Sequence, residues 1–189
     1  MPHKTSDITC RMLGAHELRR YEYYMKERSA DSLSMYFGCA MSKDAITNLV
    51  DHMVEHHENH KVLVAENCEL EIVGTIHVAL INDHEVELGI MVSEAYRNTG
   101  VSTKMMDYVL TWCRNRGVDS VTMFCLSYNA PILHVVKKYG LKITESLGNT
   151  EAKVALPRAN IFTLGRENLA VQQNIFKQNV MSFKRMLQV

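Results

Sequence analysis

The middle of the chain contains short runs of mostly hydrophobic residues, each bounded by polar turn residues, which is typical of β-strands. Three such runs follow one another, and Asn67-Cys68 and Asn82-Asp83 lie in the turns between them. Asn and Asp are favoured in tight turns, and turns this short join antiparallel neighbours. The pattern therefore predicts an antiparallel meander with strands at 61–66, 71–81 and 84–92.

Downstream of the meander the apolar spacing changes from that of a strand to that of a helix. One face of a helix predicted from Thr99 to about Arg116 carries apolar residues, and Gly117 terminates it. A further apolar strand follows at 120–126. Because a helix separates this strand from strand 84–92, the two are expected to be parallel and joined by a right-handed crossover.

Together with the outer segments, these elements predict an α/β (α+β) fold. Its core is a mixed, mostly antiparallel central sheet of about seven strands flanked by helices, with an extra C-terminal helix. The other elements predicted are a strand at 8–13, helices at 16–28, 43–58 and 129–139, a strand pair at 141–147 and 151–156 around Gly148-Asn149, and a last helix at 166–187. Residues 29–42 are predicted to be a connector.

The last helix lies outside the strand unit, which gives a catalytic domain at 1–157 and a helical extension at 158–189. An apolar seam runs along this helix at spacings of 7, 4, 3 and 4 residues. We expect the seam to pack on its own domain or on a partner chain. Its members are Leu169, Phe176, Val180, Phe183 and Leu187.

Composition excludes several classes of protein. The formal net charge is +0 and the pI about 7.1, so no cationic field is present to collect nucleic acid. The 5 cysteines are widely spaced without a CxxC pair, which argues against a disulfide framework or a zinc ribbon. The first ten residues have no apolar signal core, and no apolar run is long enough for a bilayer. A cytoplasmic protein without membrane or nucleic-acid partners is expected, and a homodimer stays open.

Arg97 to Thr103 form a polar stretch at the start of the helix that follows strand 84–92. Unpaired N–H groups at a helix start carry positive partial charge and can bind an anion. Gly100 permits close backbone approach, Ser102 and Thr103 add hydroxyl groups, and Arg97 adds a cation. The alternative is that Thr99 or Ser102 simply caps the helix. No Gly-Lys-Ser/Thr of a P-loop is present.

The wider context of this stretch resembles the GNAT superfamily of acyl-CoA-dependent N-acetyltransferases. The family signature, Arg/Gln-x-x-Gly-x-Gly/Ala, reads here Arg97-Asn98-Thr99-Gly100-Val101-Ser102, after the strand Glu87-Leu88-Gly89-Ile90-Met91-Val92. A second match is Asn129, then a helix, then Tyr139-Gly140-Leu141. The order of elements agrees over residues 7–157. Two positions depart from the family: Ser102 replaces Gly or Ala, and Val136 stands where the family often has a tyrosine acting as general acid.

The resemblance implies that acetyl-CoA is the co-substrate. Backbone N–H groups from Asn98 to Thr103 would hold its pyrophosphate, main-chain atoms of the preceding strand would pair with its pantetheine, and Asn129 would contact it from the other side. The cofactor-binding residues implied are Met91, Val92, Ser93, Arg97, Asn98, Thr99, Gly100, Val101, Ser102, Thr103 and Asn129.

The reaction implied is direct attack of a primary amine on the thioester in a ternary complex. The amine belongs to a small molecule, a protein lysine or an N-terminus. An alkylammonium with a pKa of about 10.4 must first lose a proton. Glu87 is the first candidate for the base and Glu85 the second, since both lie on one face of strand 84–92; alternatively, both are solvent-facing carboxylates. Tyr128, His134 and Tyr139 are candidates for the acid. A non-catalytic CoA-binding sensor or scaffold is the alternative function.

Four histidines lie close together in the chain at His52, His56, His57 and His60. Side chains at i and i+4 on a helix can bind zinc, but no Cys or HExxH accompanies them, and no metal site is predicted. A solvated helix end and contact with the acceptor amine are the alternatives. Residues 29–46 are weakly similar to a bacterial GNAT subgroup that includes protein-lysine acetyltransferases, with Tyr36 in place of its arginine.

Overall fold

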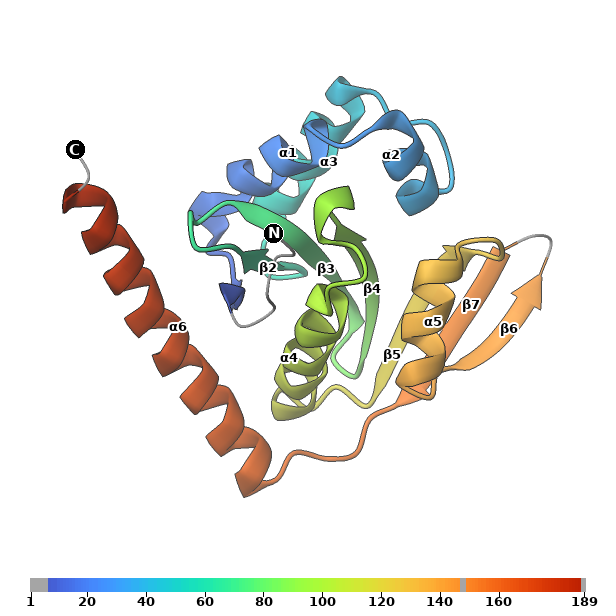
Figure 1. Ribbon diagram of the computed structural model, residues 1–189. Helices are drawn as coiled ribbons and strands as arrows, with labels where there is room; N and C mark the ends of the chain where they lie inside the picture. Colours follow the sequence, from blue (N-terminus) through green and yellow to red (C-terminus); the bar gives the residue numbers. More distant parts are fainter. Residues whose placement is uncertain (1–6, 147–148, 188–189) are drawn as a thin grey trace.

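The computed structural model describes residues 7–146 and 149–187 and contains one seven-stranded sheet of order β1-β2-β3-β4-β5-β7-β6 (Figure 1). Every pair of neighbours is antiparallel except β4 and β5. The predicted fold class and the parallel crossover are therefore confirmed. The strands are β1 (Thr9–Met12), β2 (His60–Glu66), β3 (Ile72–Asn82), β4 (Glu85–Val92), β5 (Ser120–Leu126), β6 (Lys142–Ser146) and β7 (Asn149–Ala155).

Helices cover both faces of the sheet and create two hydrophobic cores. One core lies under α1 (Leu18–Lys26), α2 (Ala30–Phe37) and α3 (Lys43–Glu55). The other lies under α4 (Val101–Asn115) and α5 (Ala130–Lys138). Successive strand residues point to opposite faces, so Val62 and Val64 enter the first core while Leu63 enters the second. This explains why β2 is apolar almost without interruption.

Strands β4 and β5 pair only at one end. The parallel register joins Glu85, Val86 and Glu87 to Ser120, Val121 and Thr122. Beyond Glu87, β4 continues to Val92 and β5 to Leu126 without pairing to each other, and Figure 1 shows the two strands diverging. One edge of β4 is thereby left open in the middle of the sheet.

The segment predicted as a connector, 29–42, contains α2, so that prediction was wrong. The Ser29 hydroxyl caps the helix by accepting from the Ser32 N–H, and Gly38 ends it with φ of +74°. A helix of 8 residues is too short for apolar periodicity to reveal it. The predicted turn at Gly148-Asn149 and the end of the predicted strand 141–147 lie at the edge of, or outside, the described residues.

The last helix, α6 (Ile161–Leu187), begins five residues earlier than predicted. Asn160 and Thr163 cap it reciprocally, the Thr163 N–H donating to Asn160 Oδ1 (2.9 Å) and the Asn160 N–H to Thr163 Oγ1 (3.0 Å). The helix lies beside α4 and β1 at one side of the molecule (Figure 1). No described helix is both long and apolar enough to cross a membrane.

Candidate active site

A cavity of about 630 Å³ lies where β4 and β5 diverge. Its walls are the open edge of β4, the start of α4, the start of α5, and α2. Of the predicted cofactor-binding residues, Met91, Val92, Arg97, Asn98, Gly100, Val101, Ser102, Thr103 and Asn129 line it, whereas Ser93 and Thr99 do not.

The start of α4 presents its backbone to this cavity. Gly100 is the N-cap residue, with φ of +86°, and Asn98 also has a positive φ of 60°. The first helical bond runs from the Lys104 N–H to the Gly100 carbonyl (3.0 Å). In the described part of the chain, the N–H groups of Val101, Ser102 and Thr103 donate to no carbonyl or side chain. They point out of the helix end, as the first amides of a helix do.

The alternative to an anion site, a cap by the side chain of Thr99 or Ser102, is not what the structure shows. Gly100 has no side chain to cap the helix, and the Thr99 hydroxyl donates to the Tyr96 carbonyl (2.6 Å). Two residues with positive φ on either side of Thr99 turn the backbone sharply and gather amides in one place. The arrangement is that of an anion site.

A polar network ties α2 to the loop before α4. The Arg97 guanidinium donates to Ser32 Oγ (2.9 Å), and the Ser29 and Ser32 hydroxyls donate to the Glu94 carboxylate (2.9 and 3.1 Å). These bonds lower the pKa of Glu94. Arg97 therefore brings its positive charge to the cavity with its direction fixed by Ser32.

The open edge of β4 provides main-chain groups to the same cavity through Ile90, Met91 and Val92. Ser93, the next residue, is used differently. Its N–H donates to the Val73 carbonyl (2.9 Å), and its hydroxyl accepts from Arg28 (2.8 Å). Ser93 thus closes the strand and takes no place in the cavity wall.

The two candidate carboxylates differ in their surroundings. Glu87 is the last β4 residue paired with β5; it is half-buried, and burial raises its pKa. Glu85 accepts from Lys153 Nζ (2.5 Å) and from the Thr122 hydroxyl (3.2 Å), and the bond from Lys153 lowers its pKa. Neither side chain lines the cavity, but Glu87 lies at the vertex from which the strands diverge.

Tyr36 was not singled out as a site residue, yet it reaches the centre of the site from α2. It lines the cavity, and its hydroxyl lies so close to Gly89 that a Cβ there would be 2.4 Å from Tyr36 Oη. Burial raises the pKa of Tyr36 to about 12, and the charge of Glu87 contributes to the rise. A glycine within a strand is a sign of such close approach and was the available signal.

The family model of the acetyltransferase (GNAT) family matches residues 16–141. The chain belongs to the GNAT family. It is an acetyltransferase, and its co-substrate is acetyl-CoA. The cavity fits this co-substrate, because it joins unpaired helix-start amides to an open strand edge.

Solved structures share the GNAT fold at low sequence identity. The GNAT domain of S. lividans PAT has a TM-score of 0.65 and 17% identity, covering 78% of this chain and 89% of that one. Spermidine N-acetyltransferase from Vibrio cholerae, in complex with CoA and spermine, has a TM-score of 0.65 and 14% identity, covering 80% and 96%. A GNAT-family acetyltransferase from Staphylococcus aureus has a TM-score of 0.63 and 16% identity, covering 79% and 99%. A search of curated proteins gives no match.

Val136 stands where GNAT enzymes often have a tyrosine that acts as general acid, and it is fully buried here. Of the other candidates for the general acid, Tyr139 is already engaged in hydrogen bonds, since its hydroxyl donates to the Thr103 carbonyl (2.9 Å) and to Asp107 Oδ1 (2.8 Å). Burial raises the pKa of Tyr139, and the hydrogen bond to Asp107 raises it further. Tyr128 is largely exposed, whereas His134 lines the cavity.

The histidines of α3 and the start of β2 gather away from the cavity. The ring of His52 lies 4.5 Å from that of His56 and 5.5 Å from that of His60. His60 Nδ1 lies 3.0 Å from Nε2 of His77, which the sequence pattern did not single out. Within the described residues, no group of three or more His, Cys, Asp or Glu is placed to hold a metal ion.

Proposed function

We propose that this protein transfers the acetyl group of acetyl-CoA to a primary amine, by direct attack while both substrates are bound. One observation carries the proposal: the unpaired amides at the start of α4 and the open edge of β4 line a single cavity. The first can bind a diphosphate and the second an extended amide-containing arm. A ligand with both groups would be held along one line, with its far end near the vertex of β4 and β5.

The cofactor-side roles follow from this placement. Amides of Val101, Ser102 and Thr103 hold the diphosphate, and Arg97 adds a positive charge. The open β4 edge at Met91 and Val92 pairs with the pantetheine, and Asn129 closes the cavity from α5. Acetyl-CoA supplies a thioester carbonyl, which is the group that the amine attacks.

Glu87 is the proposed base. The acceptor reaches neutral solution as an ammonium and must lose a proton before it can attack. A carboxylate whose pKa is raised by burial is a better base near neutral pH than an exposed one. Glu87 acts directly or through one water, and Tyr36, whose pKa the charge of Glu87 helps to raise, lines the cavity nearby. Glu85 is the weaker candidate because Lys153 already holds its carboxylate.

A non-catalytic acetyl-CoA sensor of the same fold is the second candidate, favoured by one observation. Val136 is buried in the core, so its position provides no proton for the leaving thiolate. His134, which lines the cavity, is the proposed replacement in the enzymatic reading.

The test is release of free thiol from acetyl-CoA in the presence of a panel of amines, including spermidine and a lysine-containing peptide. Spermidine is the acceptor in the name of one structural neighbour, and the peptide represents a protein lysine. Turnover with any primary amine, abolished by Glu87→Gln, supports the enzyme. Stabilisation of the protein by CoA without turnover on any amine supports the sensor. If the protein shows neither turnover nor CoA binding, both the enzyme and the sensor proposals are overturned.

A further inference from the structure

The C-terminal helix α6 packs on its own domain through its polar side. The residues of α6 that are buried or half-buried recur every three or four positions, and most of them are polar. They are Thr163, Glu167, Ala170, Asn174, Lys177, Gln178 and Met181. A surface helix of a globular domain normally turns its apolar stripe inward, so the polarity of this helix is inverted.

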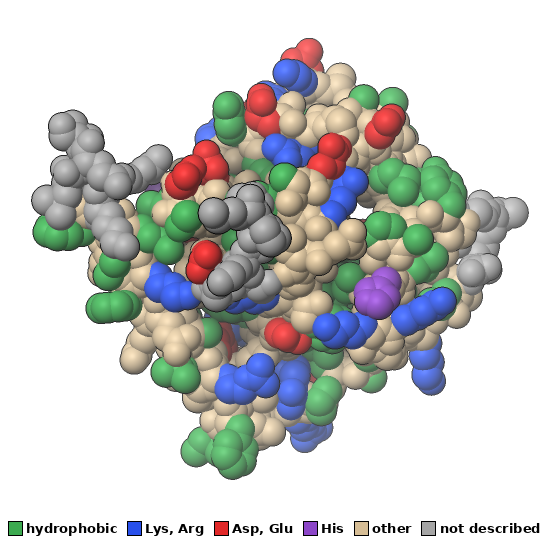
Figure 2. Space-filling view, viewed as in Figure 1, with side chains coloured by type: hydrophobic (Ala, Val, Ile, Leu, Met, Phe, Trp, Pro, Cys, Tyr) green, Lys and Arg blue, Asp and Glu red, His purple; other side chains and the backbone are tan. Residues whose placement is uncertain are grey.

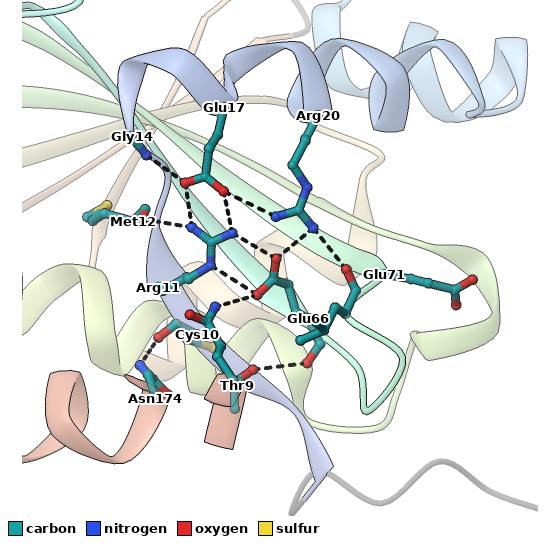
Figure 3. Close-up of polar contacts among 12 residues, drawn as sticks. Thr9, Cys10, Arg11, Met12, Gly14, Glu17, Arg20, Glu66, Glu71 and Asn174 are labelled. Atoms are coloured by element: carbon teal, nitrogen blue, oxygen red, sulfur yellow. Dashed lines mark hydrogen bonds and ion pairs between the residues drawn. The ribbon is translucent and has the colours of Figure 1, made fainter. Parts of the chain in front are cut away.

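Specific hydrogen bonds hold this polar side in place. Glu167 accepts from Asn115 Nδ2 (2.6 Å) and Arg116 Nη1 (2.8 Å). Asn174 donates to the Cys10 carbonyl, as Figure 3 shows, and Gln178 donates to Glu66 Oε2 (3.0 Å). The orientation of the helix about its axis is therefore fixed.

The carboxylate that Gln178 contacts belongs to a buried network. Glu66 is fully buried and pairs with Arg11 (3.0 Å) and Arg20 (2.8 Å), and Arg11 also pairs with Glu17 (Figure 3). Removing one member of such a network leaves an uncompensated buried charge. Rotation of α6 to bury its apolar residues on the domain would break its bond to this network.

The outer side of α6 carries a column of apolar residues at intervals of seven. Phe162, Leu169, Phe176 and Phe183 have exposed fractions of 77%, 57%, 70% and 59%. Figure 2 shows hydrophobic side chains along the edge of the molecule formed by this helix. Between Ile161 and Phe183 the charged residues are only Arg166, Glu167 and Lys177. An apolar column of this length on one face marks an interaction surface.

The area and the spacing both fit a second copy of the chain. Together with Ile161 and Val180, the column exposes on the order of 700 Å², which lies within the range that one partner buries in a standard interface. Intervals of seven residues are those of helices that pack side by side at a shallow angle. A membrane-surface helix would instead need a free, Lys- and Arg-rich polar face, and the polar face of α6 is already engaged.

We propose that two copies of this protein form a dimer by antiparallel packing of their α6 helices. The two-fold axis lies between residues 172 and 173. Phe162 then lies level with Phe183 of the partner subunit, and Leu169 level with Phe176 of the partner subunit. Each contact occurs twice, as two-fold symmetry requires. The antiparallel direction places opposite helix dipoles side by side and keeps the two Arg166 side chains apart.

The first experiment measures the mass of the full-length protein by sedimentation velocity from low to high micromolar concentration. The wild-type chain is expected to be a dimer. Leu169→Glu/Phe176→Glu is expected to weaken dimerisation by about a hundredfold or more, because it places carboxylates in the apolar contact. Leu164→Glu/Val171→Glu is the matched control: the same change at the same spacing on the same helix, at exposed positions outside the column.

The second experiment tests the direction of pairing. Leu169→Lys and Phe176→Glu are each expected to dissociate the dimer, and the two together to restore it, since antiparallel packing places the opposite charges level with each other. Parallel packing would oppose like charges, and the double variant would stay monomeric. A monomeric wild-type chain, or equal effects of the column and control variants, overturns the proposal. CoA binding checks that each variant is folded.

Discussion

At the scale of single residues, we propose that Gly100 lets a phosphate of CoA approach the start of α4 closely. It holds φ of +86° and leaves the following amides uncovered. We expect Gly100→Asp to weaken CoA binding by more than about tenfold, because a carboxylate would crowd and repel the diphosphate. Isothermal titration with CoA measures this.

The other end of the same helix provides the control. Gly117 has φ of +79°, and a Cβ added there meets nothing within 4 Å. Gly117→Asp therefore imposes the same backbone strain and the same charge change far from the cavity. Equal CoA affinities for the two variants would refute the assignment of the diphosphate to the start of α4.

The pH dependence of turnover is expected to follow the ionisation of Glu87. Burial raises its pKa above the ordinary 4.5, so the carboxylate form, which we propose is the active one, is lost as pH falls through that raised pKa. At saturating amine, turnover should therefore decline on the acid side with a slope of one proton. Glu87→Gln should lower turnover by about a hundredfold or more and remove the acid limb.

Glu85→Gln is the matched control, since Glu85 lies two residues away on the same face of β4 but is held by Lys153. We expect it to keep the acid limb and most of the turnover. An acid limb that survives Glu87→Gln, measured across the same pH range, would show that another group takes the proton.

At the scale of elements, α2 packs on β4 where Tyr36 meets Gly89 near Glu87, and we propose that the acceptor amine binds beside this contact. We expect Gly89→Ala to displace Tyr36 and α2, because the new Cβ would lie 2.4 Å from Oη and 2.9 Å from Cζ. The expected results are a lower melting temperature, corresponding to about 1–3 kcal/mol, and a raised KM for the amine with CoA affinity retained.

Two further variants separate this clash from a general effect of alanine. Gly89→Ala/Tyr36→Leu should recover the lost stability, since the shorter side chain vacates the space. Gly165→Ala adds a Cβ that meets nothing within 4 Å and should not destabilise the protein. Failure of the double variant to recover stability would indicate that Tyr36 is not what excludes a side chain at residue 89.

The elements that could be predicted from sequence are those with a local signal. The meander, the α4 crossover and α3 each repeat a spacing long enough to recognise, and their bounds agree to within a few residues. The helix α2 escaped because 8 residues give too few repeats, although Ser29 and Gly38 were cap signals at its ends. The orientation of α6 could not be predicted, for a different reason. Apolar spacing shows that the helix has an apolar face, but the hydrogen bond of Gln178 to buried Glu66 holds the polar face inward.

At the scale of the whole molecule, the site depends on contacts that no local pattern contains. The run from Arg97 to Thr103 identified the start of α4, yet Tyr36, Ser29 and Ser32 reach the cavity across about sixty positions of chain. Likewise, His77 meets His60 only because β2 and β3 are paired. Sequence spacing predicted the cavity walls formed by the start of α4 and the edge of β4, and tertiary structure was needed to show the wall formed by α2.

The buried end of this histidine cluster should govern how stability responds to mild acid. Burial, followed by the charge of His60, lowers the pKa of His77 from 6.5 to about 4. The unfolded chain therefore takes up a proton that the folded chain does not, and stability falls as pH decreases from 6.5 toward 4. Glu17 and Glu22 affect the pH dependence of stability only below about pH 4.5. Hydrogen bonds from Arg11 and Lys26, respectively, lower their pKa values from 4.5 to about 2.

The window from pH 6.5 to 4.5 thus separates the histidine from these carboxylates. In urea unfolding there, His77→Gln should reduce the slope of the unfolding free energy against pH by about 1.4 kcal/mol per pH unit, which corresponds to one proton. His84→Gln, at a largely exposed position, should leave the slope unchanged. If both variants change the slope equally, the folded protein does not keep His77 neutral, and its pairing with His60 is not maintained in solution.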